Sequence, residues 1–316
     1  MFSIEKTPDL IKEAERRIRP HIRMTPVIAS QYKGKTAFLK MENMQHTGSF
    51  KARGSLNKIM SLNSEEKGMG IITASTGNHA LGVARALQLT GTTGTIFLPD
   101  SAKQAKTEKL KNLGVPLEFV RGGPLQSELT AKSRALEDGA AWVSPYNDIA
   151  VIAGQGTIGL ELLNQVQPIR RMFITVGGGG LISGVASIMK HSLEHVEIIG
   201  CVPTNSPEMM LSVEAGKVIH LDQARPTLSD GSAGGAEDNS ITFEFCKSLV
   251  DRWVQVTEEE IAHAMRLIFE QHSVMVEGSA GVAYAAWAKS ELSTTGDVII
   301  ICGGNIEEKD FLAAIK

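Results

Sequence analysis

Lys51 is the residue whose sequence surroundings most favour chemistry. It follows the segment Thr47-Gly48-Ser49-Phe50, so a turn and an aromatic ring directly precede its amine. A lysine amine held against an apolar group loses its proton more readily than a solvated one and can form a Schiff base with a carbonyl compound. The alternative interpretation is an ordinary solvated lysine at the start of a helix. The motifs further along the chain decide between the two.

A run of four glycines, Gly177–Gly180, lies between an apolar stretch and a helical pattern. We call this run the tetraglycine loop. Backbone amides that point from a helix N-terminus, with no side chains in the way, bind phosphate. Neither a Gly-Lys-Ser/Thr sequence nor the third glycine of a dinucleotide fingerprint follows, since Ile182 and Ser183 stand there. The run therefore predicts a site for a single phosphate, or else a turn chosen for tight packing.

Two further loops follow apolar stretches. The segment Ser75-Thr76-Gly77-Asn78-His79 opens a helical pattern, so its amides could hold a carboxylate, and Asn78 could donate to a phenolic oxygen. Ser75 or Thr76 could instead cap the helix. The segment Cys302-Gly303-Gly304-Asn305 ends the last apolar stretch. Its Cys302 predicts either an inert buried thiol or a neutral hydrogen-bond partner for a ring nitrogen.

Strand and helix patterns alternate in a way that predicts where these loops lie. Apolar stretches at 70–74, 94–98, 116–120 and 141–143 alternate with helical patterns at 79–89, 102–113 and 126–137. This alternation is typical of a parallel sheet between two layers of helices. Stretches at 36–41, 171–176, 196–201 and 298–302 predict a second, larger sheet. Ligands in such folds bind beyond the carboxyl ends of the strands.

The predicted fold class is therefore α/β, with two parallel-sheet, three-layer domains. The smaller domain, 70–147, would be inserted into a larger one made of 1–69 and 148–316. The segment 206–240 has the least regular pattern and is predicted to be rich in loops.

Composition excludes several classes of protein. The 316 residues carry a net charge of -3 and contain no basic stretch, which argues against a nucleic-acid partner. No stretch approaches the roughly 20 apolar residues of a membrane span, and the N-terminus does not resemble a signal peptide. The three cysteines, Cys201, Cys246 and Cys302, are odd in number and widely separated. They favour a reducing, cytoplasmic compartment and form no metal-binding spacing.

Taken together, the motifs resemble those of pyridoxal-phosphate (PLP) enzymes of fold type II, the tryptophan-synthase-β-like group. Within that group they are most similar to the serine/threonine dehydratase and serine racemase family. The resemblance runs from Thr7 to Asn305 and includes the string Val151–Thr157. It implies PLP as the cofactor, an amino acid as the substrate and a homodimer as the assembly.

The resemblance also implies a role for each motif. Lys51 would bind the cofactor covalently and then act as the base at Cα, and Thr76 stands where some relatives have a second acid/base. The implied cofactor-binding residues are Phe50, Lys51, Asn78, Gly177, Gly178, Gly179, Gly180, Leu181 and Cys302. The implied substrate-binding residues are Ser75, Thr76, Gly77, Asn78, His79 and Tyr146. The family's cation site has a glutamate where Val202 stands here, leaving only Ser206 and Glu208, so no metal is predicted.

The implied activity is that of an ammonia-lyase that eliminates water from a threonine-like or serine-like β-hydroxy amino acid, giving a 2-oxo acid and ammonia. A neutral thiol at the ring nitrogen favours departure of a β-substituent over transamination. One alternative is the dehydratase of hydroxyectoine breakdown or of 3-hydroxyaspartate, which the segments Asn205-Ser206-Pro207 and 230–235 resemble. The others are a serine racemase and a non-catalytic binding protein of the same fold.

Overall fold

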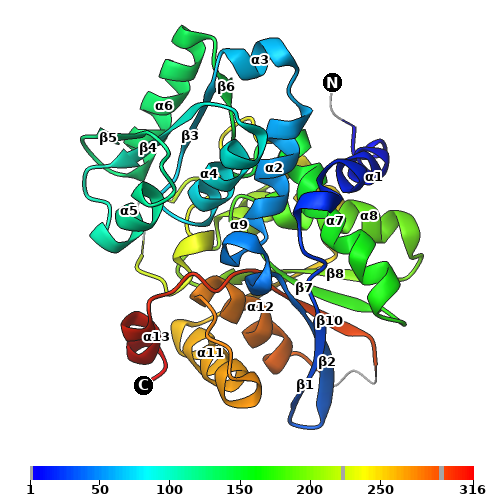
Figure 1. Ribbon diagram of the computed structural model, residues 1–316. Helices are drawn as coiled ribbons and strands as arrows, with labels where there is room; N and C mark the ends of the chain where they lie inside the picture. The colour runs from blue at the N-terminus through cyan, green and yellow to red at the C-terminus, as the bar shows by residue number, and fades with distance from the viewer. Residues whose placement is uncertain (1–2, 222–224, 292–294) are drawn as a thin grey trace.

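The strands form two separate sheets in the computed structural model, which describes residues 3–221, 225–291 and 295–316 (Figure 1). The larger sheet has six strands in the order β1 (Val27–Tyr32), β2 (Lys35–Met41), β10 (Asp297–Ile301), β7 (Arg171–Thr175), β8 (Glu197–Pro203) and β9 (Arg252–Val256). The smaller sheet has four strands in the order β5 (Leu117–Val120), β4 (Gly94–Pro99), β3 (Ile71–Ala74) and β6 (Ala141–Trp142).

The predicted α/β class is confirmed, with one difference in the larger sheet. Strands β2, β10, β7, β8 and β9 pair in parallel, whereas β1 pairs with β2 in antiparallel fashion. The prediction omitted both edge strands, β1 and β9. Most side chains of each edge strand are at least partly exposed, so neither strand has the continuous apolar pattern of a buried parallel strand.

The smaller sheet is parallel throughout and lies where the alternating pattern predicted it. One face packs Ile72 and Phe97 against Ala131 and Ala135 of α6 (Pro124–Asp138). The other face is covered by α4 (Asn78–Thr90) and α5 (Gln104–Lys111). All four strands fall between residues 71 and 142, inside the segment predicted to be inserted, while the exact division into domains stays a prediction.

Helices cover both faces of the larger sheet: Figure 1 shows α7 and α8 on one side and α11 and α12 on the other. The bounds of these four helices and of the others not yet given are α1 Thr7–Ile18, α2 Lys51–Ser61, α3 Ser64–Gly68, α7 Ile149–Gln165, α8 Gly180–Ser192, α9 Glu208–Ala215, α10 Ile241–Leu249, α11 Glu258–His272, α12 Gly278–Lys289 and α13 Glu308–Ala314. The described part of the segment 206–240 is rich in loops, as predicted, although the prediction missed helix α9. None of the helices in the described ranges combines the length and apolar character that a bilayer span requires.

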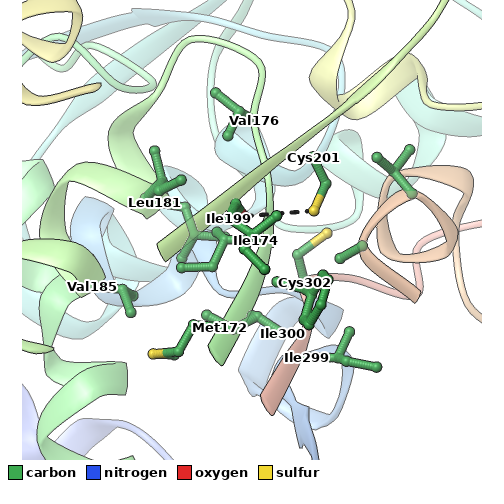
Figure 2. Close-up of a cluster of buried hydrophobic side chains, with 14 of the residues drawn as sticks. Met172, Ile174, Val176, Leu181, Val185, Ile199, Cys201, Ile299, Ile300 and Cys302 are labelled. Atoms are coloured by element: carbon green, nitrogen blue, oxygen red, sulfur yellow. Dashed lines mark hydrogen bonds between the residues drawn. The ribbon is translucent and has the colours of Figure 1, made fainter. Parts of the chain in front are cut away.

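The carboxyl ends of β7, β8 and β10 rest on the main hydrophobic core. Figure 2 shows buried side chains of these strands packed together with those at the start of α8. Leu181 and Cys302, two residues of the predicted site, belong to this cluster. The predicted site therefore stands on close-packed side chains that hold its floor rigid.

Helices α2, α7 and α8 cross without side chains between their backbones. A Cβ atom at Gly154 of α7 would lie 2.7 Å from both the Arg53 carbonyl oxygen and the Gly54 Cα of α2. A Cβ atom at Gly184 of α8 would lie 2.6 Å from the Gly156 nitrogen of α7. Real Cβ atoms essentially never come within 3.0 Å of such atoms. Glycines on two sides of α7 thus let α2 and α8 approach it at backbone contact, and we call these two crossings the glycine seam.

Replacing Gly154 with alanine should destabilise the protein by about 1–3 kcal/mol, because the added methyl group meets backbone that cannot rotate away. Urea denaturation of Gly154→Ala measures this loss of unfolding free energy. The matched control is Gly68→Ala in α3, where an added Cβ meets nothing within 4 Å. Equal unfolding free energies of the two variants would contradict the close backbone contact proposed for the glycine seam.

Candidate active site

Lys51 is the first residue of α2, and the segment before it is tied to the end of β10. Ser49 forms an antiparallel bridge with Gly303, and the Phe50 amide donates to the Cys302 carbonyl oxygen at 3.1 Å. Gly48 has a φ of 73°, which favours glycine. The turn that precedes α2 therefore brings Lys51 close to Cys302, although the two residues are 251 positions apart in the chain.

The Lys51 amine lies in an environment that disfavours its charge. Its Nζ donates to the Pro145 carbonyl oxygen at 2.7 Å and lies 5.2 Å from the centre of the Phe50 ring. Burial lowers the pKa of Lys51 to about 8, although the nearby Cys302 and Glu277 act in the opposite direction. A large fraction of this amine is therefore neutral at mildly alkaline pH, the form that attacks a carbonyl carbon.

The tetraglycine loop joins β7 to α8 and has no room for side chains. A Cβ atom added to Gly177 would lie 2.6 Å from the Ser232 carbonyl oxygen. A Cβ atom added to Gly178 would lie 2.5 Å from the Tyr146 ring. Gly179 has a φ of 84°, a conformation that other residues rarely adopt. The first amides of α8 have no partner inside the helix, because helix geometry leaves them free. This cradle fits a phosphate group.

The dipeptide Pro145-Tyr146 connects the loop to the lysine. Pro145 accepts the hydrogen bond from Lys51, and the ring of Tyr146 packs on Gly178. The Tyr146 hydroxyl accepts a hydrogen bond from the Glu237 amide at 3.2 Å, and burial raises the pKa of this hydroxyl. Tyr146 therefore supports the tetraglycine loop; its predicted contact with substrate stays a prediction.

The loop 75–79 joins β3 to α4, and its polar groups are partly committed within the protein. The Ser75 amide donates to the Phe97 carbonyl oxygen at 3.2 Å, and the Gly77 amide donates to the Ser75 hydroxyl at 3.2 Å. The Ser75 amide is thus part of the sheet and differs from the free donor predicted for a substrate carboxylate. Thr76 and the start of α4 remain the amides suited to that role.

His79 binds within the protein through both ring nitrogens. Its Nε2 lies 3.0 Å from the Val143 carbonyl oxygen, and its Nδ1 lies 3.3 Å from the Ser55 hydroxyl of α2. Burial, followed by the charge of Lys51, lowers the pKa of His79 to about 3, so the ring is neutral. Its side chain links α4 to α2, which leaves only its backbone amide for the predicted substrate contact.

Cys302 is buried beside Lys51, and its thiol is neutral. Burial, reinforced by the nearby charge of Glu277, raises the pKa of Cys302 well above its usual value. A neutral thiol can form a hydrogen bond to a ring nitrogen without fixing a positive charge on it. A buried neutral thiol fits both alternatives given for Cys302, and its contact with a ring nitrogen stays a prediction.

Glu277 is a site residue that the sequence analysis missed. The residue is only 6% exposed, and its carboxylate accepts from Asn78 Nδ2 at 2.8 and 3.0 Å and from the Asn305 backbone amide at 3.2 Å. Burial raises the pKa of Glu277 to about 7. No local sequence pattern predicts a site role for Glu277. It precedes a helix of small residues, and only the fold places it at the site.

Arg53, two residues after Lys51, was missed as well. It is fully buried and donates to both Glu42 carboxylate oxygens at 2.7 and 2.8 Å and to Glu161 at 2.9 Å. Glu42 follows β2 and Glu161 lies on α7. Because a buried guanidinium must be paired, these bonds fix the start of α2 on the larger sheet.

Ser206 and Glu208, the two residues discussed above for a cation site, form a hydrogen bond with each other. The Ser206 hydroxyl donates to Glu208 at 2.6 Å and accepts from the Gly234 amide at 2.9 Å. Across the described ranges, no group of three or more histidine, cysteine or carboxylate side chains could hold a metal ion.

Comparison with known proteins identifies the cofactor that this geometry fits. The family described as pyridoxal-phosphate dependent enzymes matches residues 18–303. The chain belongs to this family. As a PLP enzyme, it offers an amine for the cofactor aldehyde, a cradle for its phosphate and a neutral thiol for its ring nitrogen, so the residues present fit the group.

Curated relatives of this PLP enzyme include two proteins named for threonine. The chain is 41% identical over 304 residues to the L-threonine ammonia-lyase of Thermotoga maritima, covering 94% of this chain and 75% of the relative. It is 38% identical over 307 residues to the catabolic L-threonine dehydratase of Staphylococcus aureus, covering 94% and 88%. Among solved structures, maize serine racemase has a TM-score of 0.90 at 34% identity, covering 97% of this chain and 96% of that one.

The lowered pKa of Lys51 predicts how the apoprotein reacts with PLP as pH changes. The rate of attachment should rise about fivefold from pH 7 to pH 8 but less than about twofold from pH 8 to pH 9, because the amine is mostly neutral above its pKa. Stopped-flow absorbance measures this rate, with a blocked lysine amino acid as the control amine. A rise of about tenfold per pH unit throughout, as for a solvated lysine, would contradict the prediction.

Proposed function

We propose that this enzyme eliminates water from a β-hydroxy amino acid, L-threonine or L-serine, and releases a 2-oxo acid and ammonia. The observation that carries the proposal is the position of Lys51, next to a neutral Cys302 at the end of β10 and linked through Pro145-Tyr146 to the tetraglycine loop. The names of the relatives from Thermotoga maritima and Staphylococcus aureus support the same reaction.

Bound PLP would supply an electron sink that eases loss of the α-proton and departure of the β-hydroxyl group. In this proposal the Lys51 amine holds the cofactor and then accepts the proton from the substrate Cα. The tetraglycine loop and Leu181 hold the phosphate through their amides, and Phe50 packs beside the ring. Asn78 donates to the phenolic oxygen of the cofactor.

The substrate carboxylate would bind at the start of α4. The amides of Asn78 and His79 begin α4, where helix geometry leaves donors free, and the Thr76 amide would donate from the loop just before them. A helix N-terminus also favours an anion. The Thr76 hydroxyl would hold a proton on the other face of the substrate. Its methyl group narrows this space, which favours elimination over racemisation.

We further propose that the enzyme works in the cytoplasm as a homodimer, without nucleic-acid or membrane partners. The cysteines Cys201, Cys246 and Cys302 are all free and buried, which suits a reducing compartment. Sedimentation of the purified protein would give the oligomeric state directly.

The proposal is tested by the visible spectrum of the purified protein and by a 2-oxo acid assay with L-threonine, L-serine and L-threo-3-hydroxyaspartate. Oxo acid from threonine or serine is expected. Oxo acid from hydroxyaspartate alone would overturn the choice of substrate, and an inverted amino acid without oxo acid would favour a racemase.

Lys51→Ala should lower the rate of oxo-acid release by at least about a thousandfold, because it removes both the attachment point and the base. The matched control is Lys12→Ala on the exposed face of α1, which should keep the wild-type rate. A Lys51→Ala variant with a near wild-type rate would refute the mechanism.

A further inference from the structure

Glu277 is a buried acid that the proposed mechanism does not use. Its carboxylate fits against the backbone at Gly303, where a Cβ atom would lie 2.7 Å from the Glu277 Cδ. Its own amide donates to the Gly303 carbonyl oxygen at 3.3 Å. Within the described ranges, no lysine or arginine forms a salt bridge with it. A buried carboxylate held by amide groups alone is costly, so its retention calls for a role.

The hydrogen bonds around Glu277 fix the orientation of the Asn78 side chain. Asn305 Nδ2 donates to the Thr47 carbonyl oxygen at 2.7 Å and to Asn78 Oδ1 at 2.7 Å. Because a backbone carbonyl can only accept, the side-chain amide of Asn305 has one possible orientation. The Asn78 oxygen must then face Asn305, and the Asn78 nitrogen must face the Glu277 carboxylate.

The same geometry leaves Asn78 with one unused donor. The two oxygens at 2.8 and 3.0 Å from Asn78 Nδ2 belong to one carboxylate group, so a single N–H that points between them can serve both. The second N–H stays available for another acceptor. Hydrogen bonds to a charged acceptor are stronger than neutral ones, so Glu277 in its ionised form, which prevails above its pKa of about 7, holds this arrangement more firmly than a neutral side chain would.

We propose that Glu277 is a positioning residue that holds the Asn78 amide with its nitrogen toward the phenolic oxygen of PLP. It acts through Asn78 and does not itself touch the reacting atoms. This inference rests on the proposed roles of Lys51 and Asn78. It extends these roles by naming the group that orients Asn78 as a donor, because the backbone position of Asn78 alone does not fix the orientation of its side-chain amide.

The test measures PLP binding to the apoprotein of each variant. Fluorescence gives the dissociation constant, and the absorption maximum of the bound cofactor is recorded as well. Glu277→Gln has nearly the same shape, but its NH₂ group faces Asn78 Nδ2 in either orientation, because both carboxylate oxygens accept from Asn78. It should raise the dissociation constant for PLP about tenfold and shift the absorption maximum. Glu270→Gln, on the exposed face of α11, is the control and should bind as the wild type does.

A double-mutant cycle separates positioning through Asn78 from an independent effect. If Glu277 acts through Asn78, Glu277→Gln should change the affinity of Asn78→Ala by less than about twofold. The proposal would be overturned if the double variant lost PLP affinity by the product of the two single losses. It would also be overturned by a Glu277→Gln protein with the wild-type affinity and absorption maximum.

Asn305→Ala provides a second route if Glu277→Gln does not fold. It removes the donor to Asn78 Oδ1 but leaves both hydrogen bonds from Asn78 to Glu277, so the absorption maximum should stay at the wild-type position. A shift as large as that of Asn78→Ala would overturn the proposal. A wild-type apoprotein that takes up no PLP would contradict the proposed function as well. Equal uptake and equal spectra of the wild type and Glu277→Gln would contradict only this inference.

Discussion

The contact of α2 and α8 with the two sides of α7 is the constraint on which the active site depends. Lys51 begins α2 and the tetraglycine loop begins α8, so the spacing between amine and phosphate cradle is the spacing of these helices. Glycines at 154 and 184 replace adjustable side chains with backbone contact at both crossings. The buried Arg53, paired with Glu42 and Glu161, holds the same helix from the larger sheet.

Burial then gives the site its electrostatic character. The same desolvation lowers the pKa of Lys51, keeps Cys302 neutral and raises the pKa of Glu277 to about 7. A nucleophilic amine and a neutral thiol are what PLP elimination chemistry needs from its surroundings. Glu277 is the costly element of this arrangement, and its hydrogen bonds to Asn78 explain why an acid is kept there.

The sequence predicted those features that depend on local order. The loops at 75–79 and 177–180 follow buried strands and open helices, so strand and helix periodicity located both of them. The edge strands β1 and β9 and the helix α9 were missed, because their patterns are weak without the neighbours they pack on. Glu277 was missed for a related reason: it lies far from Asn78 in the sequence, and only the fold brings the two together.

The most direct test of the account is to identify the lysine that binds PLP. Borohydride reduction of the holoenzyme fixes the cofactor on that lysine, and peptide mass spectrometry locates the label. The account predicts a pyridoxyl group on Lys51, and none on the Lys51→Arg protein treated in the same way. A label on another lysine of the wild type would contradict the assignment on which the site is built.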